Sequence, residues 1–276
     1  MVDACFIKWR GTRVALKWHR ARKHATDTAF TGARIVEGMR SGASVEVDIN
    51  RIAEGGFAIL HDDHLDRETT GSGPVDQAIR AQLRGLVLRD NDGQPTDQPL
   101  MLLDDLATLL ASAGAHPDAL LQLDLKTGAD ALTPVDIAAF SHAIAAMNAR
   151  VILSSGDAAA VGMLARSLPA LLIGHDPCDE ARVDLLRQTG DFAGFVADAL
   201  AESSTAEMIY LAIPLVLEAD ARGLDLVAAF HSAGKRVDAW TMEQAEIMVL
   251  RRLLDLGVDQ ITTDDPAGLA DLARSL

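Results

Sequence analysis

The sequence predicts an α/β fold in which eight parallel strands, each followed by a helix, close into a TIM (β/α)8 barrel. Its length of 276 residues suits one such barrel. Apolar residues make up 49% of the chain and aromatic residues only 4%, so the core is mainly aliphatic, as in parallel strands covered by helices. Strand-like and helix-like runs also alternate through most of the chain.

Eight short apolar runs have the length and alternation of strands. They are expected at residues 13–18, 44–50, 120–126, 151–155, 171–174, 208–212, 236–240 and 260–263. Apolar residues at helical spacing predict helices between them, including residues 28–40, 103–112, 224–233 and 243–256. The stretch from residue 191 to residue 210 is compatible with either a helix or an extra strand.

Residues 62–100 interrupt this alternation. They are polar and rich in Gly, Pro, Asp and Gln, and they are too long for an ordinary barrel loop. We therefore expect residues 1–276 to form a single barrel domain with an insertion at about 62–100, after the second strand, that holds one short helix.

Composition excludes several classes of protein. The net charge of −15 argues against general binding to nucleic acid, whose phosphates attract basic surfaces. Cys5 and Cys178 are too far apart in sequence to indicate a disulfide framework or a zinc site. No apolar run is long enough for stable membrane insertion, and the start MVDACFIKWRGTR lacks a signal segment. These features predict a cytoplasmic protein; its oligomeric state does not follow from the sequence.

The stretch from Ser44 to His61 is the candidate reaction centre. Glu46 and Asp48 lie two residues apart in a predicted strand, so both carboxylates project from one face while aliphatic residues occupy the other. Two such carboxylates repel each other unless a positive charge lies between them, and a hard divalent cation with oxygen ligands meets that need. The pair Gly55-Gly56 predicts a tight reversal that brings His61 back beside the carboxylates.

A parallel barrel carries its active site at the carboxyl ends of its strands. Several polar or aromatic residues fall at those ends, namely His19, Asp48, Asp124, Lys126 and Trp240. This agreement favours a catalytic function over a purely structural one.

The pattern HR…ExD…HDxxLDRxTxGxGxV…DLK…WT…GVDxITTDxP, from Val14 to Pro266, resembles the glycerophosphodiester phosphodiesterase family, a group of TIM barrels. Its most specific part is HDDHLDRETTGSGPV, which begins thirteen residues after Asp48. The resemblance implies a phosphodiesterase barrel with a small insertion, as expected above.

The resemblance also implies a role for individual residues. His19 and His61 would be the catalytic histidines, and Trp240 would form a wall of the substrate pocket. One Mg²⁺ or Ca²⁺ ion would be held by Glu46, Asp48 and Asp124, and the substrate phosphate would contact Arg20 and Lys126. Asp264, in the C-terminal signature, would be structural.

Three features depart from the family pattern. His19-Arg20 is followed by Ala21 and then by ATDT, in place of the usual glycine and PENT-like motif. Asp124 stands where the family commonly has Glu. The stretch DLKTG resembles the related sphingomyelinase D enzymes, which lack the LDRxTxGxG signature that this chain keeps.

The leading interpretation is metal-dependent hydrolysis of a small anionic substrate, a glycerophosphodiester, to sn-glycerol 3-phosphate and an alcohol. One histidine would act as base and the other as acid, and the sequence leaves open which is which. The alternatives are a phospholipase-D-like lyase that forms a cyclic phosphate from lysolipids or sphingolipids, and an inactive barrel that binds a phosphorylated ligand. The lyase interpretation lacks an obvious aromatic cluster for contact with a membrane.

Overall fold

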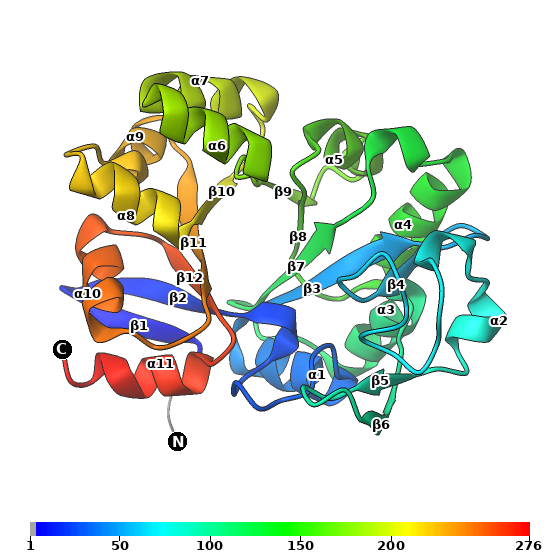
Figure 1. Cartoon of the computed structure of the whole chain (residues 1–276). Coiled ribbons are helices and arrows are strands. Elements are labelled where there is room, and N and C mark those ends of the chain that lie inside the picture. The colour runs from blue at the N-terminus through cyan, green and yellow to red at the C-terminus, as the bar shows by residue number, and fades with distance from the viewer. Residues whose placement is uncertain (1–3) are drawn as a thin grey trace.

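The computed structural model describes residues 4–276, so the first three residues of the N-terminal stretch lie outside it. Eight parallel strands close into a barrel because the last, β12, pairs with the first, β2 (Figure 1). This confirms the predicted fold class. In order around the barrel the strands are β2 (Thr12–Trp18), β3 (Ser44–Arg51), β7 (Leu120–Leu125), β8 (Val151–Ser154), β9 (Leu172–His175), β10 (Met208–Ala212), β11 (Arg236–Met242) and β12 (Gln260–Thr263).

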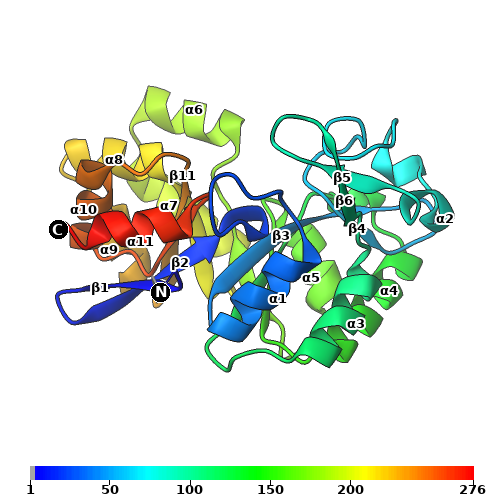
Figure 2. The same ribbon diagram turned by 90° about the horizontal axis from the view of Figure 1, so that it is seen from below.

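Helices surround the barrel on its outer side, as the two perpendicular views show (Figures 1 and 2). They are α1 (Gly32–Ser41), α3 (Leu103–Ala113), α4 (Pro134–Ala146), α5 (Ala158–Ala165), α6 (Glu180–Thr189), α7 (Phe192–Glu202), α8 (Ile213–Ala221), α9 (Leu226–Ser232), α10 (Ile247–Leu256) and α11 (Pro266–Ala273). Helix α7 resolves the ambiguous stretch, since it precedes β10 directly and leaves no room for another strand.

The main core lies between the strands and this outer layer of helices. Val45, Val47 and Ile49 of β3 belong to it and are fully buried. The barrel interior also contains a small apolar cluster with Leu120, Ile152 and Met208 near the amino ends of their strands. The carboxyl ends are left for polar side chains.

The first helix begins later than predicted, at Gly32 rather than near residue 28. In the segment before it, the carboxylate of Asp27 accepts hydrogen bonds from the backbone N–H groups of Lys23 and His24. Phe30 then has a φ of 61°, which is incompatible with a continuous right-handed helix. The chain therefore turns once more before α1 starts.

The predicted reversal after β3 is confirmed. Gly55 and Gly56 have φ values of 84° and 96°, which favour glycine, and the chain returns as β4 (Phe57–Ile59), antiparallel to β3. The following segment holds α2 (Arg80–Leu83) and a hairpin of β5 (Val87–Arg89) and β6 (Pro95–Pro99). The sequence did not predict this hairpin because β6 is polar and bounded by prolines, nor did it predict β1 (Phe6–Trp9), which pairs antiparallel with β2.

Within residues 4–276, no helix combines the length and the apolar character needed to cross a membrane.

Gly38 allows α1 to pack closely on β3. A Cβ atom at this helical position would lie 2.5 Å from Val45 Cγ2 and 3.2 Å from Trp18 Cε3. We predict that Gly38→Ala lowers the free energy of unfolding by about 1–2 kcal/mol, because overpacking outweighs the roughly 1 kcal/mol gained in helix propensity. Chemical denaturation would measure this change.

Gly162 in α5 provides the matched control, since a Cβ atom there would meet nothing within 4 Å. Gly162→Ala should stabilise the protein by about 0.5–1 kcal/mol. Equal stabilisation by the two substitutions would contradict the close packing of α1 on β3.

Candidate active site

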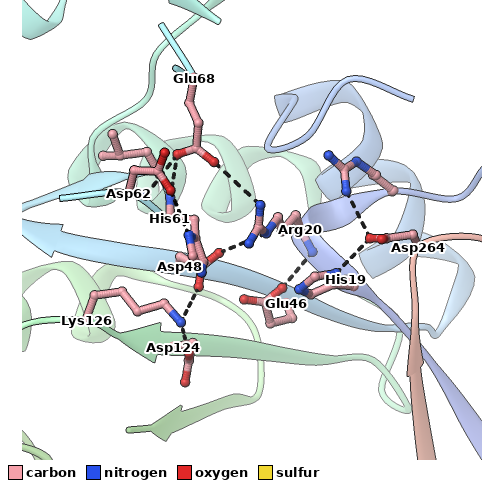
Figure 3. Close-up of polar contacts among 12 residues, drawn as sticks. His19, Arg20, Glu46, Asp48, His61, Asp62, Glu68, Asp124, Lys126 and Asp264 are labelled. Carbon is pink, nitrogen blue, oxygen red and sulfur yellow. Dashed lines mark hydrogen bonds and ion pairs between the residues drawn. The ribbon is translucent and has the colours of Figure 1, made fainter. Parts of the chain in front are cut away.

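Three carboxylates meet at the carboxyl ends of two neighbouring strands (Figure 3). Glu46 and Asp48 come from β3 and Asp124 comes from β7, where the parallel register places Asp48 beside Asp124. One carboxylate oxygen from each residue lies within 4.8 Å of the others. The predicted alternation along β3 is thus confirmed, since both acidic side chains leave the face opposite the buried aliphatic residues.

Burial makes this grouping electrostatically costly. Loss of water, and then the negative charge of Asp48, raise the pKa of Glu46 to about 7. Burial acts in the same direction on Asp48, but the charges of Lys126, His61 and Arg20 outweigh it and lower the pKa of that carboxyl. The cluster therefore combines one firmly ionised carboxylate with one that resists ionisation.

The cluster is suited to a hard divalent cation. Its donors are all carboxylate oxygens, which such ions prefer. Lys126 Nζ lies 2.9 Å from Asp48 Oδ1 and 2.6 Å from Asp124 Oδ2. Among residues 4–276 no group makes a hydrogen bond to the buried Asp48 Oδ2. A buried carboxylate oxygen without a hydrogen bond is expected where a metal ion supplies the missing contact, so Glu46, Asp48 and Asp124 could hold one.

His19 follows β2 in a short 3₁₀ turn, His19–Ala21. Its Nδ1 lies 2.7 Å from Asp264 Oδ1, so the signature aspartate contacts a candidate catalytic residue directly. The next residue, Arg20, has a φ of 52°, and its backbone N–H donates to Glu46 Oε2 at 2.6 Å. The turn thus connects the histidine to the carboxylate cluster.

His61 reaches the site by the return strand β4. Its Nδ1 lies 3.0 Å from Asp62 Oδ1, and its backbone N–H donates to Glu68 Oε2 at 2.8 Å. Hydrogen bonds from Arg67 lower the pKa of Asp62 to about 2, so this carboxylate is ionised beside the ring. The buried amide of Asn50 donates to the carbonyl oxygens of Leu60, His61 and Asp62 and fixes the loop.

His61, Asp62 and Glu68 form a second group whose potential ligand atoms lie within 4.8 Å of one another. Their oxygens are already engaged, because Asp62 binds the Arg67 guanidinium and Glu68 accepts from two backbone N–H groups. This group holds the loop that carries His61.

The two histidines are thus oriented in the same way. In each, Nδ1 faces an aspartate, which favours the tautomer that carries its proton on Nδ1. No residue in the described part of the chain makes a hydrogen bond to either Nε2. Each ring therefore has a nitrogen available for proton transfer.

Two cations border the carboxylates. Although burial opposes it, the charges of Asp124 and Asp48 raise the pKa of Lys126, so this side chain is protonated. Arg20 extends between Asp48 and Glu68, at 3.7 Å and 3.6 Å (Figure 3). Both cations lie where they could contact an anionic group bound at the cluster.

The structure brings all the predicted site residues together around one cavity of about 340 Å³, a volume suited to a small ligand. These residues are His19, Arg20, Glu46, Asp48, His61, Asp124, Lys126 and Trp240.

Several lining residues were missed by sequence reasoning. Burial raises the pKa of Asp176 to about 7, and this residue reaches the cavity, whereas His175 points away towards Glu202. Tyr210 also lines the cavity, and within residues 4–276 its buried hydroxyl has no hydrogen-bond partner. Lys17 lines the cavity as well. It lies two residues before His19 along β2, so the alternation of side chains along the strand could have identified it.

Comparison with known proteins gives a consistent result. The sequence model described as the glycerophosphoryl diester phosphodiesterase family matches residues 31–268. The chain is 28% identical to "Probable glycerophosphodiester phosphodiesterase 2" of Mycobacterium tuberculosis, over 84% of this chain and 78% of that protein. It is 26% identical to a glycerophosphodiester phosphodiesterase of Caldanaerobacter subterraneus, over 88% of this chain and 91% of that protein.

Solved structures share the fold. A phosphodiesterase from Oleispira antarctica, in complex with its product sn-glycerol-3-phosphate, superimposes with a TM-score of 0.67 and 18% identity. The match covers 94% of this chain and 96% of that one.

Proposed function

Because the chain belongs to the glycerophosphoryl diester phosphodiesterase family, we propose that it hydrolyses glycerophosphodiesters to sn-glycerol 3-phosphate and an alcohol, using one divalent cation and two histidines. One observation carries this proposal. Two histidines, each oriented through Nδ1 by an aspartate, face the same cavity as a group of three carboxylates, two of them buried.

The character of the cavity supports a small anionic phosphodiester as substrate. The phosphate would contact Arg20 and Lys126, the two cations beside the carboxylates, and Trp240 would form part of the opposite wall. The product bound to the Oleispira antarctica enzyme, sn-glycerol-3-phosphate, is likewise a small anionic phosphate ester.

In this proposal, Glu46, Asp48 and Asp124 hold the cation, with Mg²⁺ and Ca²⁺ as the candidates. When bound, it would polarise the phosphoryl oxygens. One histidine accepts the proton of the attacking hydroxyl at Nε2, while the other donates an Nε2 proton to the leaving oxygen. Asp264 and Asp62 keep both rings oriented and stabilise their protonated forms. Lys126 and Arg20 offset the charge of the phosphate.

We also propose that residues 62–100 are an insertion into one barrel domain and that they serve to position His61. Within this segment Glu68 accepts hydrogen bonds from the backbone N–H groups of His61 and Asp62. Thr69, which is fully buried, donates to the carbonyl oxygen of Leu65 at 2.7 Å. Thr69, a fixed position of the LDRxTxGxG signature, thus closes the turn that carries Glu68 to the proposed catalytic residue His61.

His19→Ala and His61→Ala should each lower kcat by about 10²-fold or more, the usual contribution of a general acid or base. Thermal unfolding should change little, because both rings border the cavity. The control is His64→Ala, since the exposed His64 side chain pairs with Asp63, away from the carboxylate cluster, and should be dispensable. Wild-type turnover in either of the first two variants would remove that histidine from the mechanism.

Asp264→Asn should lower kcat by about tenfold or more, because an amide neither fixes the His19 tautomer nor stabilises the protonated ring as a carboxylate does. His19 and Arg22 lower the pKa of Asp264 against the effect of burial, so the wild-type group is anionic. Steady-state kinetics should show the change in kcat more than in KM. Asp63→Asn is the matched control, and an equal effect of both substitutions would contradict the orienting role.

Phosphorus NMR of glycerophosphocholine turnover tests the course of the reaction. With Mg²⁺ present we expect open-chain glycerol phosphate as the final product, and with excess EDTA we expect no turnover until Mg²⁺ is restored. A cyclic phosphate that accumulates as the end product would favour the lyase. Full activity in EDTA would instead exclude the proposed metal dependence.

A further inference from the structure

A chain of buried hydrogen bonds runs inside the barrel and ends on Asp124. Lys17 Nζ donates to Gln122 Oε1 at 2.5 Å, and Gln122 Nε2 donates to Ser154 Oγ at 2.8 Å. Ser154 Oγ then donates to Asp124 Oδ1 at 2.6 Å. Lys17, Gln122 and Ser154 are exposed by 2%, 4% and 0% of their surfaces.

The ammonium group of Lys17 fixes the donor and the acceptor in each hydrogen bond of this series. An ammonium group only donates, so the amide oxygen of Gln122 must face Lys17 and its NH₂ group must face Ser154. Because that NH₂ group donates to Ser154 Oγ, the single hydroxyl proton of Ser154 is directed to Asp124. The hydroxyl has no freedom to reverse its role while Lys17 stays in place.

Lys17 is itself held firmly. Its Nζ lies 3.1 Å from Asp238 Oδ2 and 4.3 Å from the centre of the Tyr210 ring. Asp238 is fully buried and accepts hydrogen bonds from Gln260 and Thr262 of the next strand. Lys17, where the series of hydrogen bonds begins, is therefore held by Asp238 of β11, across the barrel from Asp124 of β7.

We propose that Ser154 is a positioning residue for the metal ligand Asp124 and that its hydrogen bond strengthens the binding of the divalent cation. This inference rests on the proposed function. With Ser154 on Oδ1 and Lys126 on Oδ2, the carboxylate is held at both oxygens, and each oxygen keeps a lone pair for the ion. Without Ser154 the short aspartate side chain could rotate about the single contact to Lys126.

A purely structural role for Ser154 makes a different prediction, and the neighbouring Ser155 separates the two. Ser155 is also buried, but its hydroxyl donates to the backbone carbonyl of Leu125, at 2.9 Å, rather than to a carboxylate. Removing the Ser154 hydroxyl costs its hydrogen bonds with Gln122 and Asp124, and removing the Ser155 hydroxyl costs its hydrogen bonds with the Leu125 carbonyl and the Asp157 backbone N–H. Only Ser154→Ala removes one from Asp124.

The test is the binding of Mn²⁺ to the purified protein, followed by the electron paramagnetic resonance signal of the free ion. Ser154→Ala should weaken Mn²⁺ binding by about 10–100-fold, the usual effect of losing a group that orients a ligand. Ser155→Ala should keep wild-type affinity although its thermal stability also falls. Ser154→Thr, which keeps the hydroxyl, should restore much of the affinity. Gln122→Met, which leaves Ser154 in place but undirected, should weaken binding less than Ser154→Ala.

Wild-type Mn²⁺ affinity in Ser154→Ala, or an equal loss in Ser155→Ala, would overturn the inference and leave the proposed metal site intact. If the wild-type protein itself binds no Mn²⁺, the proposed metal site fails, and the role of Ser154 fails with it. Circular dichroism of each variant would show that the comparison is made between folded proteins.

Discussion

Mutual repulsion among Glu46, Asp48 and Asp124 is the constraint on which the arrangement of the site depends. The register between β3 and β7 sets two of the carboxylates side by side, and alternation along β3 adds the third. Burial removes the water that would otherwise screen them. The neighbouring groups respond to this charge: Lys126 bridges two of the acids, and the backbone N–H of Arg20 donates to Glu46. After these contacts, one oxygen of Asp48 is left without a hydrogen bond within residues 4–276.

The interior of the barrel also contains polar groups that adjoin the carboxylate cluster. Barrels of this kind are usually filled with branched aliphatic side chains. Here an apolar layer near the amino ends of the strands gives way to a layer that contains Lys17, Gln122 and Asp238. A buried lysine is costly unless it is paired, and Asp238 supplies that partner. Because the hydrogen bonds from Lys17 through Gln122 and Ser154 have a fixed direction, this layer directs a donor to one member of the carboxylate cluster, Asp124.

Local patterns in the sequence predicted the parts of the site that depend on neighbours along the chain. Strand parity predicted the direction of Glu46 and Asp48, and the double glycine predicted the return of His61. Contacts between side chains on different strands were not predictable. Asp264 meets His19 across 245 positions of sequence, and Ser154 contacts Asp124 from the next strand. At the end of β9, neighbouring side chains point in opposite directions. Asp176 lines the cavity, and His175 faces the outer helices.

The two histidines are carried by different parts of the molecule. His19 follows a barrel strand, whereas His61 lies after β4, an antiparallel strand added to the edge of β3, and is held by the loop that contains Glu68. Local opening of that loop would displace His61 while the carboxylates stayed on β3 and β7. In the proposed mechanism, such an opening would remove the proposed catalytic residue His61 and leave the three proposed cation ligands in place.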